Sequence, residues 1–479
     1  MPDPARPGQA RSSGITYQQL LDTDTKPVPE VLRLESPQYL GDEDIANSRY
    51  TSRDWHEREV ERLWKRVWQF ACREEQIQHV GSYVVYDIAN LSFIVMRSAP
   101  GEIKAFYNAC LHRGRQLKDV SGRCSEMRCP FHGFSWKLDG TLGHVPARWD
   151  FEHVDDSQWS LPEVKVGTWG GFVFINPDPN CVPLEEFLGG LPEHFARWDM
   201  EGRYIQGHVC KVVRANWKVV QEAFCESYHV GGTHPQALPY LGDVNSQVDI
   251  WDTFSRIITP GGTASPLLGW DPTEEDILRY MLDIRVDEET FVSLAPGQKA
   301  RAASAAAARE RWRPVVGDLV DEWSDAEFID NIDYTLFPNF HPWGAYNRIV
   351  YRFRPNGDDH TTALHEIFLL APFSGERPLP AKTTYLGPDD SYTEAAELGM
   401  LGKVFDQDGF NMPMVQKGLT QTCATVRPST ACWWASVAAV HQHRHGGRRP
   451  ADRRGRQPAQ RRVLRTSGTT PAAPAAWRC

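Results

Sequence analysis

The sequence predicts an α+β fold, in which a block of short strands precedes a region of longer helices and antiparallel strands. Two observations predict this order. Short strand-like runs separated by turn residues, such as Pro100-Gly101, occupy the region before the Pro177-Asp178-Pro179 turn. Beyond about residue 216 apolar residues recur at helical spacing, on both sides of a hairpin signal at Pro355-Asn356-Gly357.

In the first block, a helix is predicted over Arg53–Trp68. Its apolar side chains between Val60 and Val67 fall on one face, and Thr51 and Asp54 have the spacing of a capping box. Strands are then predicted at Ser82–Tyr86, Leu91–Arg97, Ile103–Asn108, Phe134–Leu138 and Trp169–Asn176, with a turn at Asp139-Gly140. These elements describe an all-β domain that carries two loops.

In the second block, a strand at Val209–Arg214 precedes a helix from Asn216 to about Tyr228. Further helices are predicted at Glu274–Ile284, 299–312, Glu394–Leu401 and about Val404–Leu419, and hairpin strands at Arg348–Arg354 and Thr361–Leu370. We therefore expect a loosely held arm over residues 1–40, a first domain over 41–160 and a second over 161–426. Residues 427–479 form an Arg/Ala/Pro-rich tail that resembles out-of-frame coding sequence and is expected to be disordered.

Composition narrows the class of protein. The net charge of −10 divides into +10 on residues 427–479, with eleven Arg and one Asp, and −20 on residues 1–426. An acidic body argues against nucleic acid as a partner. The sequence shows neither a signal peptide nor an apolar run long enough to span a membrane, and its ten scattered cysteines suit a reducing compartment. We therefore expect a cytoplasmic protein.

Two Cys–His pairs carry the strongest chemical signal. Cys110-Leu111-His112 is followed, after sixteen intervening residues, by Cys129-Pro130-Phe131-His132. A Rieske-type [2Fe–2S] cluster needs two thiolates on one iron and two imidazoles on the other. A structural zinc site also accepts two Cys and two His, but zinc fingers usually pair Cys with Cys and His with His. The mixed pairs favour the cluster.

A second metal site is predicted near the end of the helix that starts at Asn216. His229 and His234 are five residues apart, so a continuous helix would separate their directions by roughly 140°. Gly231-Gly232 would let the helix end or bend, so that both rings face one metal. Two His and a carboxylate form the ligand set of non-haem Fe(II) oxygenases, and Asp408 is the candidate carboxylate.

Taken together, these motifs resemble those of the large (alpha) subunits of Rieske non-haem iron oxygenases, which include the aromatic-ring-hydroxylating dioxygenases. The matching runs are Cys110-Leu111-His112-Arg113-Gly114, Cys129-Pro130-Phe131-His132-Gly133, Trp169-Gly170-Gly171-Phe172-Val173-Phe174, Asn216-Trp217-Lys218, Glu226-x-x-His229-x4-His234, Phe337-Pro338-Asn339 and Asp408-x-x-Asn411-Met412. The resemblance covers about residues 45–420.

The resemblance implies a Rieske domain followed by a helix-grip domain, an antiparallel sheet curved around a long helix, with mononuclear Fe(II). It also implies a head-to-tail homotrimer or an α3β3 assembly, in which the cluster of one subunit reduces the iron of its neighbour. A carboxylate, here Glu226, would bridge His132 of one subunit to His229 of the next. Ala223 stands where some dioxygenases carry Asn, which leaves any polar role at that position open.

The implied function is the oxygenase component that hydroxylates an apolar, aromatic substrate with O₂, with ring dihydroxylation favoured. Monooxygenation and oxidative demethylation by the same machinery are alternatives, as is, from another class, an electron carrier fused to a ligand-binding module. No Gly-x-Gly-x-x-Gly follows a strand, so electrons from NAD(P)H must arrive through a reductase, with or without a ferredoxin.

Some further residues allow finer predictions. Arg113, Arg115, Lys118, Arg123 and Arg128 surround the cluster loops and could steer an acidic donor, with Arg115, Lys118 and Arg123 the more exposed members. Alternatively, these side chains bind loop carbonyls or neighbouring acids. Phe224, Phe337, Phe340 and Trp343 could line a substrate pocket or belong to the core, whereas His341 and His365 are expected to be structural.

Overall fold

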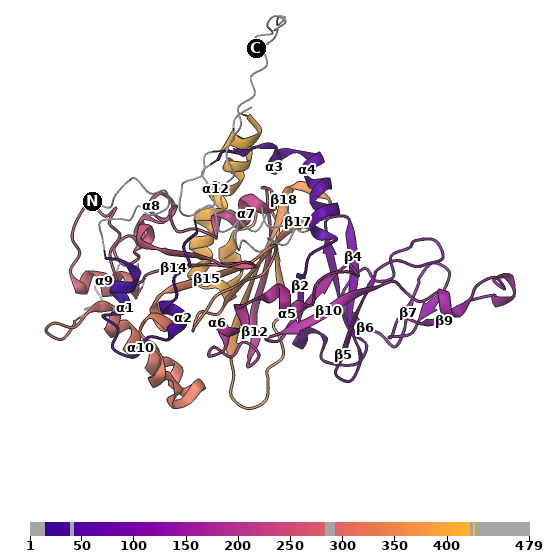
Figure 1. The fold of residues 1–479 in the computed structure, drawn as a ribbon, viewed down its shortest axis with the longest axis horizontal. Coiled ribbons are helices and arrows are strands. Elements are labelled where there is room, and N and C mark those ends of the chain that lie inside the picture. The colour runs from indigo at the N-terminus through magenta and orange to yellow at the C-terminus, as the bar shows by residue number, and fades with distance from the viewer. Residues whose placement is uncertain (1–14, 39–42, 283–292, 422–424, 427–479) are drawn as a thin grey trace, which may run out of the picture.

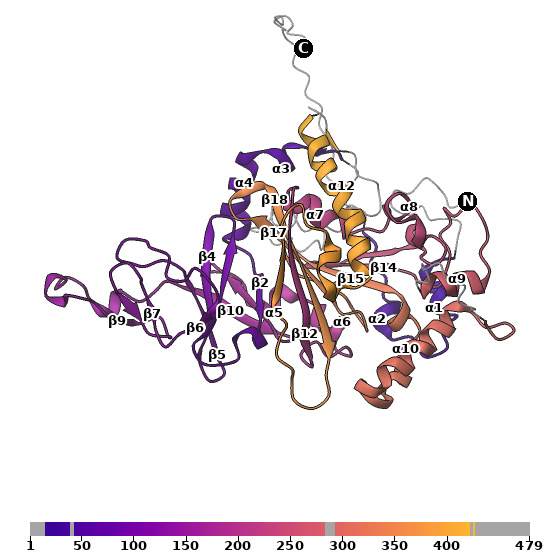
Figure 2. The same ribbon diagram turned by 180° about the vertical axis from the view of Figure 1, so that it is seen from behind.

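The computed structural model describes residues 15–38, 43–282, 293–421 and 425–426. Figure 1 shows a β-rich part at one end, which carries β3 to β9, and a larger mixed part that carries α7, α12 and β12 to β18. The view from behind in Figure 2 has the same division. The α+β class and the order of the two parts, strands first, are therefore as predicted.

Seven strands form the main sheet of the first part, in the order β2-β11-β10-β5-β4-β3-β6 within the described chain. Their bounds are β2 Gln69–Arg73, β3 Ser82–Ile88, β4 Leu91–Ala99, β5 Glu102–Tyr107, β6 Gly122–Arg123, β10 Glu163–Trp169 and β11 Phe172–Asn176. A small sheet of β7 (Met127–Arg128), β8 (Ser135–Trp136) and β9 (Leu142–His144) lies beside it. The expected boundary at residue 160 would divide the main sheet, because β10 and β11 belong to it.

The strand predicted over Trp169–Asn176 begins later, at Phe172, because Trp169 ends the preceding strand and a hairpin turn lies between them. Trp169, the last residue of β10, pairs with Phe172, the first of β11. Gly170 and Gly171 form the turn with φ of 57° and 78°, the left-handed region in which glycine is favoured. The two glycines therefore terminate one strand and begin the next.

The second part contains a sheet in the order β16-β17-β18-β12-β19 and a smaller one in the order β13-β14-β15. The bounds are β12 Arg203–Val213, β16 His341–Pro342, β17 Ile349–Asn356, β18 Asp359–Pro372 and β19 Thr383–Leu386 for the first, and β13 Gln247–Ile250, β14 Phe254–Thr259 and β15 Asn331–Leu336 for the second. All described pairs are antiparallel except β12 with β19. Isolated bridges, including Asp333 to Trp343, join β15 to the segment around β16.

Two helices pack on the five-stranded sheet, as Figure 1 shows: α7 (Trp217–Ala223) and the long α12 (Leu401–Gln421). Phe405, Asp408, Met412, Gln416 and Leu419 are all buried on α12, and their spacing of three or four residues puts them on one face. A curved sheet that holds a long helix is the helix-grip arrangement, so this prediction is confirmed.

Several predicted helices differ in extent. The helix predicted over Arg53–Trp68 is capped by Ser52, whose side chain accepts from the Trp55 N–H, and not by Thr51. It consists of α4 (Arg53–Glu59) followed by a π-helical turn, η1 (Val60–Trp64). Glu394–Leu401 is not one helix, because two 3₁₀ turns, η8 (Tyr392–Glu394) and η9 (Ala396–Leu398), precede α12. The helices expected near 274 and 299 are α9 (Glu274–Met281) and α10 (Ala300–Val316).

The loosely held arm predicted for residues 1–40 is wrong for the described part of it. Helices α1 (Tyr17–Leu21) and α2 (Glu30–Arg33) bury Tyr17, Leu20, Leu21 and Leu32. Between them, Asp24 accepts a hydrogen bond from Arg301 at 2.9 Å, at the start of α10. The apolar side chains of these short helices fix the segment to the second part of the protein.

The remaining predictions concern the two ends of the chain. The predicted disorder of residues 427–479 lies outside the described residues. Just before it, β20 (Thr425–Val426) pairs with β1 (Ile45–Ala46). Among the described residues, none of the helices combines the length and the apolar character that crossing a membrane requires.

Candidate metal centres and substrate cavity

The two cluster loops share one backbone design. In each loop the N–H of the cysteine donates to the carbonyl five residues later, Cys110 to Arg115 and Cys129 to Phe134, both at 2.8 Å. In each loop the glycine four residues after the cysteine, Gly114 or Gly133, donates back to the cysteine carbonyl. Both glycines have positive φ, 74° and 81°, which lets the loop close tightly.

This design brings the four predicted ligands together. Cys110 and Cys129 are buried, and their thiols are within hydrogen-bonding reach of each other. The rings of His112 and His132 lie 4.7 Å apart between centroids. Within the described structure, His112 Nδ1 is buried without a hydrogen-bond partner. Two adjacent thiols and two imidazoles, one with a free ring nitrogen, fit a [2Fe–2S] cluster of the Rieske type.

The histidines of the second site lie at the two ends of a short helix. Helix α7 ends at Ala223, earlier than the predicted Tyr228, and α8 covers Val230–Thr233. His229 is the N-cap of α8, and His234 is its C-cap. Gly231 and Gly232 lie inside α8 and do not end it, so their predicted role is wrong. The chain leaves helical geometry at His234, whose φ is −124° and ψ 52°.

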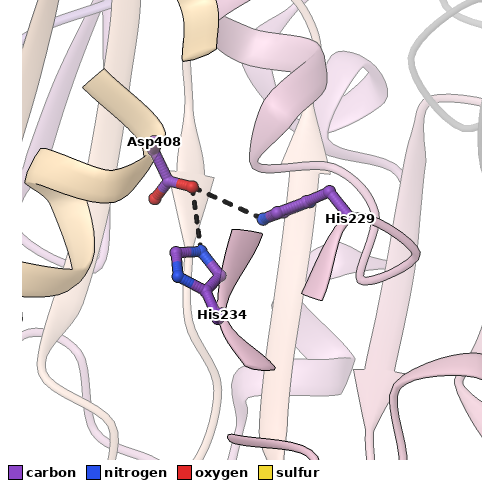
Figure 3. Close-up of side chains that lie close together, drawn as sticks. All are labelled: His229, His234 and Asp408. Atoms are coloured by element: carbon purple, nitrogen blue, oxygen red, sulfur yellow. Dashed lines mark hydrogen bonds and ion pairs between the residues drawn. The ribbon is translucent and has the colours of Figure 1, made fainter. Parts of the chain in front are cut away.

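Asp408 completes the group, as Figure 3 shows. Its Oδ1 lies 2.9 Å from His234 Nε2 and 3.5 Å from His229 Nε2. The three possible ligand atoms all lie within 4.8 Å of one another. Asp408 and His234 are buried, and His229 is partly buried. Two imidazoles and a carboxylate that converge in this way fit a mononuclear Fe(II) site with positions left open.

The other ring nitrogen of each histidine has its own acceptor. Glu226 Oε1 lies 2.7 Å from His229 Nδ1, and Gln407 Oε1 lies 2.8 Å from His234 Nδ1. Acceptors at Nδ1 hold the proton there and leave each Nε2 lone pair directed at the common centre. Gln407 was missed by the sequence analysis, since a glutamine beside an aspartate carries no recognisable signal.

The two aspartates of this part of α12 have different partners. Asp406, two residues before Asp408, accepts hydrogen bonds from the Ser391 hydroxyl and the Tyr392 N–H. Two residues on a helix differ in direction by about 200°, so Asp406 faces away from the histidines when Asp408 faces them. Asp406 therefore binds the start of η8, and Asp408 is the carboxylate that lies beside the two histidines.

The charges around His229 affect its protonation. Burial lowers the pKa of His229, but the hydrogen bond to Glu226 and the charges of Glu226 and Asp408 outweigh it, so the net shift of the pKa is upward. The site thus surrounds its histidines with negative charge, which also favours a bound cation.

Comparison with known proteins identifies the family. A family model described as "Ring hydroxylating alpha subunit (catalytic domain)" matches residues 192–446, and one described as "Rieske [2Fe-2S] domain" matches residues 67–155. The chain belongs to the ring-hydroxylating alpha subunits. Its cofactors are accordingly a Rieske [2Fe–2S] cluster and a mononuclear iron.

Two curated relatives illustrate the range of the family. The carnitine monooxygenase oxygenase subunit of Escherichia coli (strain K12) is 31% identical over 189 residues, which are 39% of this chain and 50% of that protein. The anthranilate 1,2-dioxygenase large subunit of Acinetobacter baylyi is 32% identical over 200 residues, 40% of this chain and 42% of that protein. The chain thus spans about half the length of the curated relatives it matches.

Solved structures share the fold at lower identity. A quaternary ammonium Rieske monooxygenase in complex with L-carnitine has a TM-score of 0.57 and 18% identity, covering 84% of this chain and 94% of the other. A naphthalene 1,2-dioxygenase variant bound to phenanthrene has a TM-score of 0.60 and 18% identity, covering 85% and 93%. These likenesses support the fold of this alpha subunit.

A cavity of about 490 Å³ opens beside the candidate iron ligands of this alpha subunit. His229, His234 and Asp408 all line it, together with Ala223 at the position that is Asn in some dioxygenases. Of the four predicted aromatic residues, Phe224 and Trp343 line the cavity, whereas Phe337 and Phe340 lie in the hydrophobic core. The size is that of a small-molecule site.

The two histidines that were expected to be structural each lie beside a hydroxyl group in the protein interior. His341 Nδ1 lies 3.1 Å from the Thr335 hydroxyl, and His365 Nδ1 lies 2.8 Å from the Tyr392 hydroxyl. Burial lowers the pKa of each to about 3, so both rings are neutral. Neither joins the metal group.

The basic residues around the cluster are partly neutralised. Arg115 forms two hydrogen bonds with Asp119, at 2.8 and 2.9 Å, and Arg128 pairs with Glu126 at 2.7 Å. Arg123 donates to the Val80 carbonyl but stays exposed. The predicted order of exposure is wrong for Arg113 and Arg128, which are exposed, and for Arg115 and Lys118, which are half-buried. The guanidinium of Arg113 lies over the Phe131 ring.

Proposed function

We propose that this chain is the oxygenase component of a Rieske non-haem iron oxygenase system. The observation that carries the proposal is the convergence of His229, His234 and Asp408 on the wall of a small-molecule cavity, in a chain that also holds two Cys–His loops. An Fe(II) bound there supplies the activation of dioxygen, with electrons that originate in NAD(P)H and arrive from a reductase, with or without a ferredoxin.

Each residue has a defined part in this proposal. Cys110, His112, Cys129 and His132 hold the cluster, and His229, His234 and Asp408 hold the iron. Glu226 and Gln407 keep the proton on Nδ1 of the two histidines, so that each Nε2 remains free to bind metal. The cavity walls orient the substrate and exclude bulk water.

The arrangement of the two centres supports an assembly of several copies. Figures 1 and 2 place the cluster loops, near β7 and β9, at the opposite end of the chain from α8. Large apolar side chains are exposed at both ends. Phe131 and Trp149 of the cluster end are 59% and 76% exposed, and Tyr228 and Phe410 near the iron are 60% and 73% exposed. We propose a head-to-tail homotrimer, with or without beta subunits, in which these surfaces meet.

Two reactions compete within this function. Ring dihydroxylation of an aromatic substrate was favoured from the sequence, and the anthranilate and naphthalene dioxygenases carry out reactions of that kind by name. Monooxygenation is the alternative, by analogy with relatives named carnitine and glycine betaine monooxygenases. Polar groups in the cavity wall favour monooxygenation of a polar substrate, because an aromatic hydrocarbon would leave these groups without hydrogen-bond partners.

The test uses iron-loaded protein, a surrogate reductase, isotopically labelled dioxygen, and a panel of arenes, aryl ethers and quaternary ammonium compounds. Incorporation of one labelled oxygen atom indicates monooxygenation, and incorporation of two indicates dihydroxylation. A substrate-independent measurement accompanies it: the reduced cluster should be reoxidised by dioxygen faster in iron-loaded protein than in Asp408→Ala. Equal rates would favour an electron carrier fused to a binding module.

A further inference from the structure

Asp333 is a buried carboxyl group in the wall of the cavity. Alternation along β15 puts Asn331 and Asp333 on the face that lines the cavity, while the alternate residues Ile332 and Tyr334 belong to the hydrophobic core. Asp333 is only 4% exposed, and its Oδ1 has no hydrogen-bond partner among the described residues. A buried polar atom without a partner is unfavourable, and Asp333 lines the cavity, so a ligand group there could supply the missing partner.

No basic side chain compensates this carboxyl group within the described structure. Burial alone raises the pKa of Asp333 well above its ordinary value, and no neighbouring charge contributes to the shift. Buried carboxylates elsewhere in this protein have such partners: Asp249 pairs with Arg256, and Glu366 pairs with Arg352. Asp333, by contrast, has no basic partner among the described residues, so a cation from outside the chain could pair with it.

Aromatic rings surround the same place. Trp343 pairs with Asp333 through a β-bridge, and the rings of Trp343 and Tyr351 lie 6.0 Å apart at 84°. Both rings line the cavity, as does Phe224, whose ring lies 5.0 Å from that of Tyr351. Ring faces attract ammonium groups, above all where water is excluded.

Tyr351 connects this corner to the metal site. Burial is the main cause that raises the pKa of Tyr351, and the charges of Asp333 and Asp408 raise it further. Tyr351, Asp333 and Asp408 all line the same cavity. A substrate group held by Asp333 would thus lie near the iron ligands.

Arg311 provides the opposite charge at another point of the cavity. Helix α10 lines the cavity with Ser304, Ala307, Ala308 and Arg311, which share one face of the helix. Three neighbouring arginines of this helix have acidic partners: Arg301 with Asp330, Arg309 with Asp325 and Arg313 with Asp321. No ion pair of Arg311 is found in the part of the chain that the structure describes, and its side chain is exposed.

Building on the proposed oxygenase function, we propose that the cavity binds a small zwitterion. Its ammonium group meets Asp333, Trp343 and Tyr351, and its anionic group meets Arg311. An apolar aromatic substrate would fill the volume but leave Asp333 unpaired, whereas an ammonium group supplies the missing charge. Asp333 then determines specificity by rejecting neutral molecules of the same shape.

The experiment measures binding by calorimetry without oxygen, on protein that carries both metal centres. Two probes of matched shape are compared: γ-butyrobetaine and 5,5-dimethylhexanoate, in which carbon replaces the ammonium nitrogen. The variants are Asp333→Asn, Trp343→Leu and Arg311→Gln. Arg313→Gln is the matched control, because Arg313 lies on the same helix, outside the cavity lining, and pairs with Asp321.

We expect wild-type protein to prefer the ammonium probe by at least about tenfold. Asp333→Asn and Trp343→Leu should reduce this preference to less than about threefold, whereas Arg311→Gln should weaken both probes equally and Arg313→Gln neither. Equal binding of the probes, binding of neither, or an unchanged preference in folded Asp333→Asn or Trp343→Leu overturns the proposal. Circular dichroism and the content of mononuclear iron verify folding of each variant.

The outcomes also separate this inference from the proposed function. Oxygenation of arenes by a protein that shows no preference for the ammonium probe would sustain the function and overturn the zwitterion. A clear ammonium preference without iron-dependent reoxidation of the cluster would sustain the binding site and contradict the oxygenase.

Discussion

The carboxylate of Glu226 holds His229 at two points. One oxygen lies 2.7 Å from the ring Nδ1, and the other accepts a hydrogen bond from the backbone N–H at 3.0 Å. The carboxylate therefore fixes both the start of α8 and the orientation of the ring. Glu226 is also near the exposed Tyr228, at the surface where we propose that the cluster of a second copy docks.

The Glu226→Gln substitution keeps the shape of the side chain and removes its charge. We expect both metal centres to be retained and electron transfer between them to slow by at least about tenfold, since the amide cannot bridge two imidazole N–H groups. Single-turnover mixing of pre-reduced protein with substrate and oxygen measures the rate of cluster oxidation. A wild-type rate would contradict the bridge.

Removing any one of His229, His234 and Asp408 should empty the mononuclear site. Alanine at each position should abolish iron at that site while the visible spectrum of the cluster stays intact, because the cluster loops are in the other part of the chain. Metal analysis and absorbance measure the two centres separately. Asp406→Ala is the control, because Asp406 binds Ser391 and Tyr392 instead, and it should retain iron.

Mixed assemblies test the head-to-tail arrangement. His132→Ala impairs the cluster and Asp408→Ala impairs the iron site, so each variant alone should be inactive. Co-expression should restore part of the activity, because an intact cluster in one subunit then faces an intact iron site in the next. The specific activity of the mixed assembly should fall on dilution if its subunits dissociate. Absence of any complementation would favour transfer within one chain.

The exposed cations of the cluster end should affect the rate of donor association. Reversing Arg113 and Arg123 to Glu should slow reduction by the donor, with an effect that fades as salt rises, while dithionite reduction stays unchanged. The double variant Arg115→Gln/Asp119→Asn removes a paired couple without changing net charge, and it should behave like wild type. Equal donor rates in all proteins would place docking elsewhere.

Asp333 should make stability depend on pH. Its pKa is raised by burial in the folded protein, so above about pH 4 the folded state keeps a proton that the unfolded state has lost. The free energy of unfolding then falls as pH rises, by up to about 1.4 kcal/mol per pH unit. Asp333→Asn lacks this loss, so its stability relative to wild type should increase between acidic and neutral pH. Denaturant titrations at several pH values measure the difference.

The two metal groups were predictable because their chemistry restricts spacing. Mixed Cys–His pairs have few structural explanations, a His-x4-His motif gains meaning beside them, and the structure brings each set together. The turn at Pro100-Gly101 likewise marked its strands correctly. The turns, each cluster loop and the histidine pair are local in sequence, which is why sequence reasoning reaches them.

What was missed depends on distant contacts. Gln407 acquires its role only because His234, 173 residues earlier, is brought beside it. The ordered segment around Asp24 depends on Arg301, and its helices are too short to show periodicity. The polarity of the cavity follows from Asp333 lying among aromatic rings of other strands. None of these relationships is visible in a short window of sequence.

The position of Asp408 along the chain also sets an order for assembly during synthesis. The cluster loops are complete once His132 has been made, but Asp408 lies 174 residues beyond His234. Chains fold from the N-terminus as they emerge, so the two loops can close while the iron site still lacks its carboxylate. The loops that bind the [2Fe–2S] cluster are therefore synthesised well before the site that binds mononuclear iron is complete. A chain whose synthesis stopped in between could hold a reducible cluster but would have no iron site to receive its electrons.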